Sequence, residues 1–183
     1  MAFSKSNRWK NFRKPLQYYH YIAYYYTDEK IYGKIRSIII DALCSLDEME
    51  LALKTSIAGV EGEVDAKARL NVRMPIKHKV KKITEKRRRS LKKKLSKNDG
   101  ILHVNIIIKY TYMKDEKRSY AWADKYHLDI FFSNGIIALG ILHEKGLRRI
   151  SPRDLAKIIY FQAIKMMRKK GIEPRLRELK EIF

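Results

Sequence analysis

The sequence predicts a mixed α+β fold with an N-terminal helical region, a central sheet of about four strands and C-terminal helices. Two observations lead to this prediction. Apolar residues recur at helical spacing over residues 28–44 and 152–170. Between these segments, 101–113 and 136–142 are rich in β-branched and aromatic residues, which is typical of strands. Since 45% of the 183 residues are hydrophobic, the chain can build a core and is not disordered as a whole.

Shifts in composition divide the chain into three parts. Residues 1–15 hold basic and aromatic side chains but no acid, which predicts an extended arm. Residues 16–58 are predicted to be mainly helical, and residues 59–183 to form an α/β core. A basic insertion at 77–97 interrupts this core, with twelve Lys or Arg against one acid. Free in solution, so many like charges would repel one another, and a polyanion would order them.

The helical region is predicted from three patterns. The tyrosine-rich segment 16–26 places several aromatic residues on one side of a helix. An amphipathic helix then covers 28–44, with acids in its first turn. Ser45 followed by Glu48 is a capping-box pattern, which predicts a further short helix through about Thr55.

The core is predicted from strand patterns followed by a helix start. Apolar and charged residues alternate over 60–72, and 101–113 is almost continuously apolar, as in a central buried strand. Residues 120–132 fit either a strand or a helix. Ser151 at the N-cap, with Pro at the next position, opens a helix that runs to about Lys170.

The charge balance predicts a polyanionic partner. The chain has 41 Lys and Arg against 20 Asp and Glu, a net charge of +21. Such an excess favours nucleic acid, and we expect duplex DNA rather than RNA, bound through phosphates with little reading of bases. An RNA-binding or ribosome-associated protein is the alternative. The predicted nucleic-acid-binding residues lie in the arm, the basic insertion, a basic pair and the end of the last long helix: Lys5, Arg8, Trp9, Lys10, Arg13, Lys14, Lys77, Lys79, Lys81, Lys82, Lys86, Arg87, Arg88, Arg89, Lys92, Lys93, Lys94, Arg148, Arg149, Arg168, Lys169 and Lys170.

Other features limit the location and the assembly. The longest apolar run, Ile136–Leu142, is far too short to span a membrane, and we see no signal peptide. The single cysteine, Cys44, excludes an internal disulfide and a cysteine-based zinc site. We expect a virion or intracellular protein, with a composition that suits a thermophile. Coating a genome requires contacts between copies in a homo-oligomer or filament, for which the tyrosine-rich segment 18–26 is the candidate.

One order of motifs points to a known family. A strand with Gly62-Glu63-Val64-Asp65 precedes, by some forty residues, a strand that contains Lys109, and a basic pair then leads to a closing helix. This order resembles the PD-(D/E)XK nuclease core, above all the RecB-like branch that includes the CRISPR-adaptation nucleases. The resemblance implies metal-dependent cleavage of a phosphodiester, with Asp65 as one metal-binding carboxylate and Lys109 stabilising the developing charge.

The departures from the family pattern favour a protein that has lost cleavage. Ile107 stands where the second carboxylate is expected, and the expected Gln and Tyr fall near His127 and on Phe131. A scaffold that keeps DNA binding without cofactor or catalysis would resemble the basic nucleoproteins of filamentous archaeal viruses. We therefore expect a DNA-coating nucleocapsid or chromatin-like protein.

An active nuclease is the alternative. Glu63 and Asp65 would bind Mg²⁺ or Mn²⁺, because carboxylates two residues apart share one face of a strand, and Lys109 would assist them.

Overall fold

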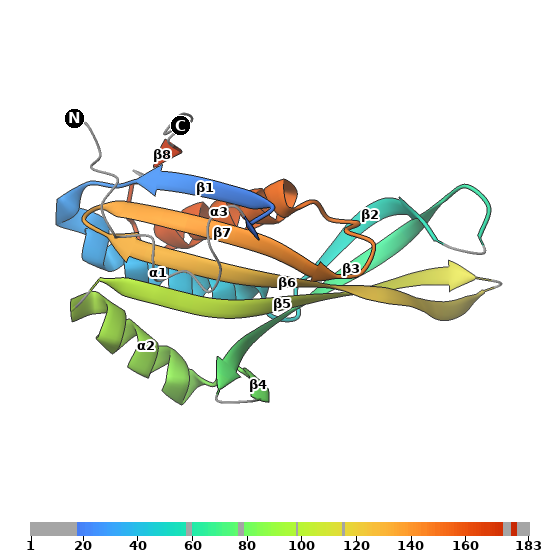
Figure 1. Ribbon diagram of the computed structural model, residues 1–183, viewed down its shortest axis with the longest axis horizontal. Helices are drawn as coiled ribbons and strands as arrows, with labels where there is room; N and C mark the ends of the chain where they lie inside the picture. Colours follow the sequence, from blue (N-terminus) through green and yellow to red (C-terminus); the bar gives the residue numbers. More distant parts are fainter. Residues whose placement is uncertain are drawn as a thin grey trace.

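The chain forms one large antiparallel sheet with helices packed on it (Figure 1). The computed structural model describes residues 18–57, 60–76, 79–97, 99–114, 116–173 and 177–178. Within them, eight strands pair in the order β2-β3-β5-β6-β7-β1-β8, and β4 pairs with β3. The predicted α+β fold with about four strands, and with it the PD-(D/E)XK layout, is wrong. Strands hold about half of the described residues, and each pairing between them is antiparallel.

The centre of the sheet consists of four long strands. The predicted strands correspond to β3 (Glu63–Ile76), β5 (Gly100–Lys114) and β7 (Ile136–Lys145), and the ambiguous segment is strand β6 (Lys117–Ser133). Their alternate side chains face the helices and are fully buried. On β5 these are Leu102, Val104, Ile106 and Ile108. Each buried aliphatic side chain of this size contributes about 1.5–3 kcal/mol to folding.

Two helices, each 18 residues long, cover the inner face of this sheet, as the sequence predicts. In α1 (Glu29–Leu46), the Asp28 side chain accepts a hydrogen bond from the Lys30 N–H. In α3 (Pro152–Lys169), the Ser151 hydroxyl accepts one from the Asp154 N–H, which caps the helix. No helix of the described residues is long and apolar enough to cross a membrane.

The N-terminal tyrosine-rich segment is a strand, which corrects the predicted helix over 16–26. β1 (Tyr21–Tyr26) pairs with β7 on one side and with β8 (Arg177–Glu178) on the other. Tyr24 and Tyr25 are both 6% exposed, on opposite faces of the sheet. Successive strand residues point to opposite faces, so Tyr25 joins the main core while Tyr24 packs with Phe131 and Ala138 on the other face, and this tertiary packing overrides the helical spacing.

The predicted helix from Ser45 to Thr55 is also wrong. Ser45 lies inside the last turn of α1, where its hydroxyl donates a hydrogen bond to the Ala42 carbonyl oxygen at 2.7 Å instead of capping a new helix, and Asp47 is the C-cap of α1. Glu48 then adopts a φ of 69°, which reverses the chain into strand β2 (Glu50–Ser56). The basic insertion contains the short strand β4 (Lys79–Lys82) and the helix α2 (Glu85–Lys97).

Candidate nucleic-acid interface

Helix α2 separates its side chains into an inner and an outer face. Leu91 and Leu95 contact the hydrophobic core, and Leu95 is only 4% exposed. The helix begins after Thr84, whose carbonyl oxygen accepts the Arg88 N–H at 2.9 Å. Glu85 lies in the first turn, where a negative charge is favourable. The basic insertion is therefore an ordered part of the fold, and its back is fixed to the protein.

A buried carboxylate on α1 holds the inner cations of α2. Asp41, 3% exposed, accepts hydrogen bonds from the Arg88 guanidinium at 2.7 and 2.8 Å and from Lys170 Nζ at 2.6 Å. Lys92 forms a further ion pair with the same carboxylate. Burial alone would raise the pKa of Asp41, but the hydrogen bonds from Lys170, Lys92 and Arg88 outweigh it and lower the pKa to about 2. We call these four residues the Asp41 cluster.

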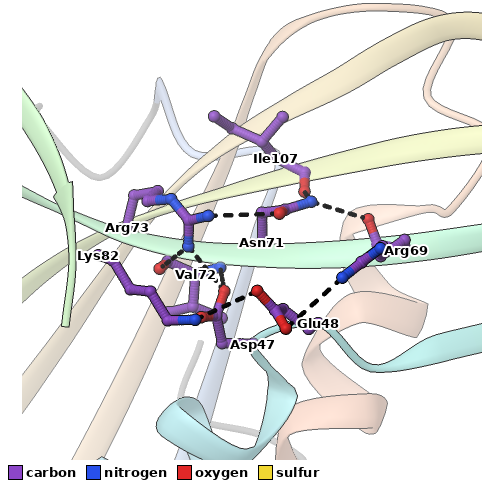
Figure 2. A network of polar contacts seen from close by, with 8 residues as sticks. All are labelled: Asp47, Glu48, Arg69, Asn71, Val72, Arg73, Lys82 and Ile107. Atoms are coloured by element: carbon purple, nitrogen blue, oxygen red, sulfur yellow. Dashed lines mark hydrogen bonds and ion pairs between the residues drawn. The ribbon is translucent and has the colours of Figure 1, made fainter. Parts of the chain in front are cut away.

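A second carboxylate network fixes the hairpin of β3 and β4 (Figure 2). Asp47 accepts the Val72 N–H at 2.9 Å and pairs with Arg73 at 2.7 Å and Lys82 at 3.1 Å. Lys82 also reaches Glu48 at 3.2 Å. Burial would raise the pKa of Asp47, but the bonds from Val72, Lys82 and Arg73 lower it. Lys82, predicted to contact nucleic acid, is therefore occupied by two acids of the same chain.

A further set of cations lies on the outer side of this region. Within the described residues, Lys79, Lys81, Lys86, Arg87 and Lys94 form no ion pair. Arg89 pairs only with exposed Glu85, at 3.4 Å, and such surface pairs are weak. With the exposed Lys93, these residues make up what we call the β4–α2 surface: Lys79, Lys81, Lys86, Arg87, Arg89, Lys93 and Lys94.

The spacing of these charges suits a phosphate backbone. Lys86, Arg89 and Lys93 follow one another at intervals of three and four residues on the exposed side of α2, so they form one row about 10 Å long. β4 precedes the N-terminus of the helix and adds two lysines from one strand face. The whole surface carries seven cations, with Glu85 as the acid beside them.

The basic pair after β7 serves the fold. Asp124, fully buried on β6, accepts the Arg148 and Arg149 N–H groups at 2.8 Å each and the Tyr110 hydroxyl at 2.6 Å. The Arg149 guanidinium lies 5.0 Å from the centre of the Tyr110 ring. At Gly146, φ is 105° and a Cβ would lie 2.1 Å from the Asp124 carboxylate, so only glycine fits. Both arginines were predicted to bind nucleic acid. Their backbone belongs to this turn, and the side chain that remains exposed is that of Arg148.

The end of α3 supplies a second exposed basic region. Arg168 and Lys169 line an open groove of about 590 Å³ together with Lys165 and the ring of Phe161, which is 65% exposed. An exposed aromatic ring among cations can stack on a base or a sugar. The sequence prediction omitted Phe161. A signal was available, because Phe161 has a lysine four residues before it and another four residues after it, on the same side of a predicted helix.

The structure does not assemble the nuclease site. Glu63, Asp65 and Lys109 are all exposed on the outer face of the sheet, but Lys109 is paired with Arg69. Arg69 is four positions beyond Asp65 along β3, a distance of about 13 Å. Among the described residues, no three His, Cys, Asp or Glu side chains gather as a metal site would need.

Part of the predicted interface lies outside the described residues. This applies to Lys77 and to the whole basic aromatic arm, with Lys5, Arg8, Trp9, Lys10, Arg13 and Lys14.

Comparisons with known proteins identify no family. No family model matches the sequence, and no curated protein matches it. A crystal structure of a lipopolysaccharide binding protein is similar over 84% of this chain and 40% of its own, with 8% identity and a TM-score of 0.31. A likeness this weak supports no argument about fold or function.

Proposed function

We propose that this chain is a non-enzymatic protein that binds nucleic acid through its phosphates, with little reading of base sequence. The observation that carries the proposal is the β4–α2 surface, where two lysines of β4 and five cations of α2 lie together. The opposite side of α2 is fixed by the Asp41 cluster. A fixed row of cations loses little conformational freedom when it binds, whereas a polyanion releases counterions on contact.

Duplex DNA fits this surface better than duplex RNA. An exposed helix can approach the wide major groove of B-form DNA or lie across its backbone. The major groove of A-form RNA is deep and too narrow for a helix. In its fuller form, the proposal is a coating role, as in a nucleocapsid or chromatin-like particle, in which many copies neutralise one genome.

The first experiment measures binding to a labelled linear duplex over a range of salt concentrations. If about eight phosphates are neutralised, the slope of log K against log[salt] will be near −7. Replacing Lys86, Lys93 and Lys94 with Glu should make this slope less steep by about 2.7, which is the share of three phosphates.

A matched control separates this surface from the overall charge. Lys109, Lys114 and Lys117 are equally exposed but lie on β5 and β6, away from α2. Their replacement with Glu changes the net charge by the same amount and should alter the slope much less. Equal slopes for the two triple variants would contradict the assignment of the β4–α2 surface.

Two further arms test the partner and the chemistry. An equimolar competition between duplex DNA and structured RNA should favour DNA, and preference for RNA would support the ribosome-associated alternative. Incubation with Mg²⁺ or Mn²⁺ should leave the duplex intact on a denaturing gel. Metal-dependent shortening of the strands that is lost in Asp65→Ala would overturn the non-enzymatic assignment.

A further inference from the structure

Strand β2 ends the sheet on one side. It pairs with β3 along its whole length, and no strand among the described residues pairs with its other edge (Figure 1). An open edge offers N–H and C=O groups to another strand. Along β2 the side chains of Glu50, Ala52 and Lys54 are exposed, whereas Leu51 and Leu53 are half-buried. The edge therefore has one charged face and one apolar face.

The register with β3 fixes which backbone groups point outward. The Leu70 N–H donates to the Met49 carbonyl oxygen at 2.9 Å, so this aligned pair is of the hydrogen-bonded type. Hydrogen-bonded and non-hydrogen-bonded pairs alternate along an antiparallel ladder. Leu51 and Leu53 therefore direct their N–H and C=O groups toward β3. Glu50, Ala52 and Lys54 direct theirs away from the sheet.

These outward groups match a second copy of the same strand. In an antiparallel pair related by a two-fold axis at Ala52, Glu50 lies opposite Lys54 of the other copy, and Leu51 lies opposite Leu53. An axis at Leu53 would leave both charges without an opposite charge, and an axis at Lys54 would bring two lysines together. The axis at Ala52 is the one that joins opposite charges.

The neighbouring strands extend the same complementarity. Within one chain, Lys54 is paired with Asp65 and Glu50 is paired with Arg69, all four on the outer face. Across the proposed contact, the outer face would show Asp65, Lys54, then Glu50 and Arg69 of the second copy, with charges that alternate in sign. Opposite charges on adjacent strands stabilise a sheet, and like charges destabilise it.

We propose that two copies of this chain associate edge to edge through β2, in the register that places Glu50 of each copy opposite Lys54 of the other. The two sheets then continue into one. This contact does not depend on nucleic-acid binding. The sequence suggests the tyrosine-rich segment 18–26 for contacts between copies, but Tyr24 and Tyr25 are buried within the fold. The contact through β2 would provide this link instead.

Charge exchange tests the register on the full chain without nucleic acid. Sedimentation equilibrium near physiological ionic strength, where repulsion between the two basic copies is screened, should show a monomer–dimer equilibrium. Lys54→Glu places two glutamates opposite each other and Glu50→Lys places two lysines. For each variant alone, the dissociation constant of the dimer should rise about tenfold or more, because both symmetry-related pairs become repulsive.

Mixing the two single variants is the decisive measurement. Glu50→Lys carries two lysines and Lys54→Glu two glutamates, so a mixed dimer has opposite charges at both positions. Association should return on mixing, and also in the double exchange Glu50→Lys/Lys54→Glu. If Glu50 and Lys54 act only within their own chain, the double exchange should not restore association. It would then place a glutamate beside Asp65 and a lysine beside Arg69 in the same chain.

A control variant and the opposing outcomes complete the test. Lys109→Glu makes the same change in net charge on β5, an interior strand, and should leave association unchanged. Far-ultraviolet circular dichroism of each variant verifies that it is folded. A wild-type chain that stays monomeric at every concentration, or single variants that fail to associate on mixing, would overturn the proposal.

Discussion

Asp124 and Asp41 are both buried, but the two carboxylates interact with different kinds of partner. Asp124, 0% exposed, accepts its hydrogen bonds from neutral donors, namely two backbone N–H groups and one tyrosine hydroxyl, and the His143 Nε2 atom lies 3.6 Å from its carboxylate. Asp41, 3% exposed, is surrounded by three cationic side chains whose own exposure is 26–44%. The donors to Asp124 are the backbone of the turn after β7 and the hydroxyl of the buried Tyr110 side chain, and neither can rotate away as a long exposed side chain can. The donors to Asp41 can turn outward, so the first carboxylate holds the fold and the second holds a basic helix in place.

The largest effect should come from Asp124→Ala. Removing the carboxylate leaves the buried Tyr110 hydroxyl and two partly buried N–H groups without their acceptor, and each group left unpaired away from water costs about 1–3 kcal/mol. We expect the free energy of unfolding to fall by about 3–5 kcal/mol, measured by urea denaturation followed by circular dichroism.

Tyr110→Phe is the matched control for this change. It removes one donor and leaves both backbone bonds to Asp124 in place, so it should cost about 1 kcal/mol. Equal losses for the two variants would mean that the backbone turn at Arg148 and Arg149 does not depend on the carboxylate.

The next largest effect should come from Asp41→Asn. The folded pKa of about 2 lies below the ordinary value of 3.8, so the ionised form stabilises the protein at neutral pH. This contribution, about 2 kcal/mol, is present above pH 4 and is lost as the pH falls toward 2. The variant should be less stable than the wild type at pH 7, and the difference should disappear near pH 2.

Unfolding free energies measured across that pH range verify this expectation. A constant difference between Asp41→Asn and the wild type would show that the effect comes from packing of the amide and not from the charge.

The sequence predicts local periodicity better than it predicts long-range pairing. Residues 101–113 and 152–170 gave correct elements because each pattern agrees with the burial that the fold imposes. The helices predicted over 16–26 and from Ser45 to about Thr55 are wrong, because Tyr21–Tyr26 and Glu50–Ser56 are strands in which, for example, Leu51 and Leu53 alternate with exposed residues. Both segments are strands because each pairs with a longer strand, β1 with β7 and β2 with β3. The spacing of residues within one segment does not show such pairing.

The candidate interface shows the same limit. Composition alone located the basic insertion, since twelve cations in one segment are visible without a fold. Composition could not show that Arg88, Lys92 and Lys170 share one carboxylate, because Asp41 lies 47 and 129 residues away from two of them. Which cations face outward is decided by the packing of α2 on α1, through Leu91 and Leu95.

The smallest effect, and the one that best connects the Asp41 cluster with binding, concerns the salt dependence of Asp41→Asn. The amide keeps the shape of the side chain but no longer attracts Arg88, Lys92 and Lys170, which can then turn toward a phosphate backbone. Three added contacts would make the slope of log K against log[salt] steeper by about 2.7.

Glu144→Gln is the matched control, because it raises the net charge equally but releases Lys125 on β6, away from α2. Both slopes can be measured by fluorescence anisotropy with the same duplex. If Asp41→Asn and Glu144→Gln give the same slope, the released cations do not contact phosphate, and the duplex does not lie along α2. A steeper slope for Asp41→Asn alone would place the duplex along α2, and it would show that Asp41 limits the affinity of this surface in exchange for holding the helix in place.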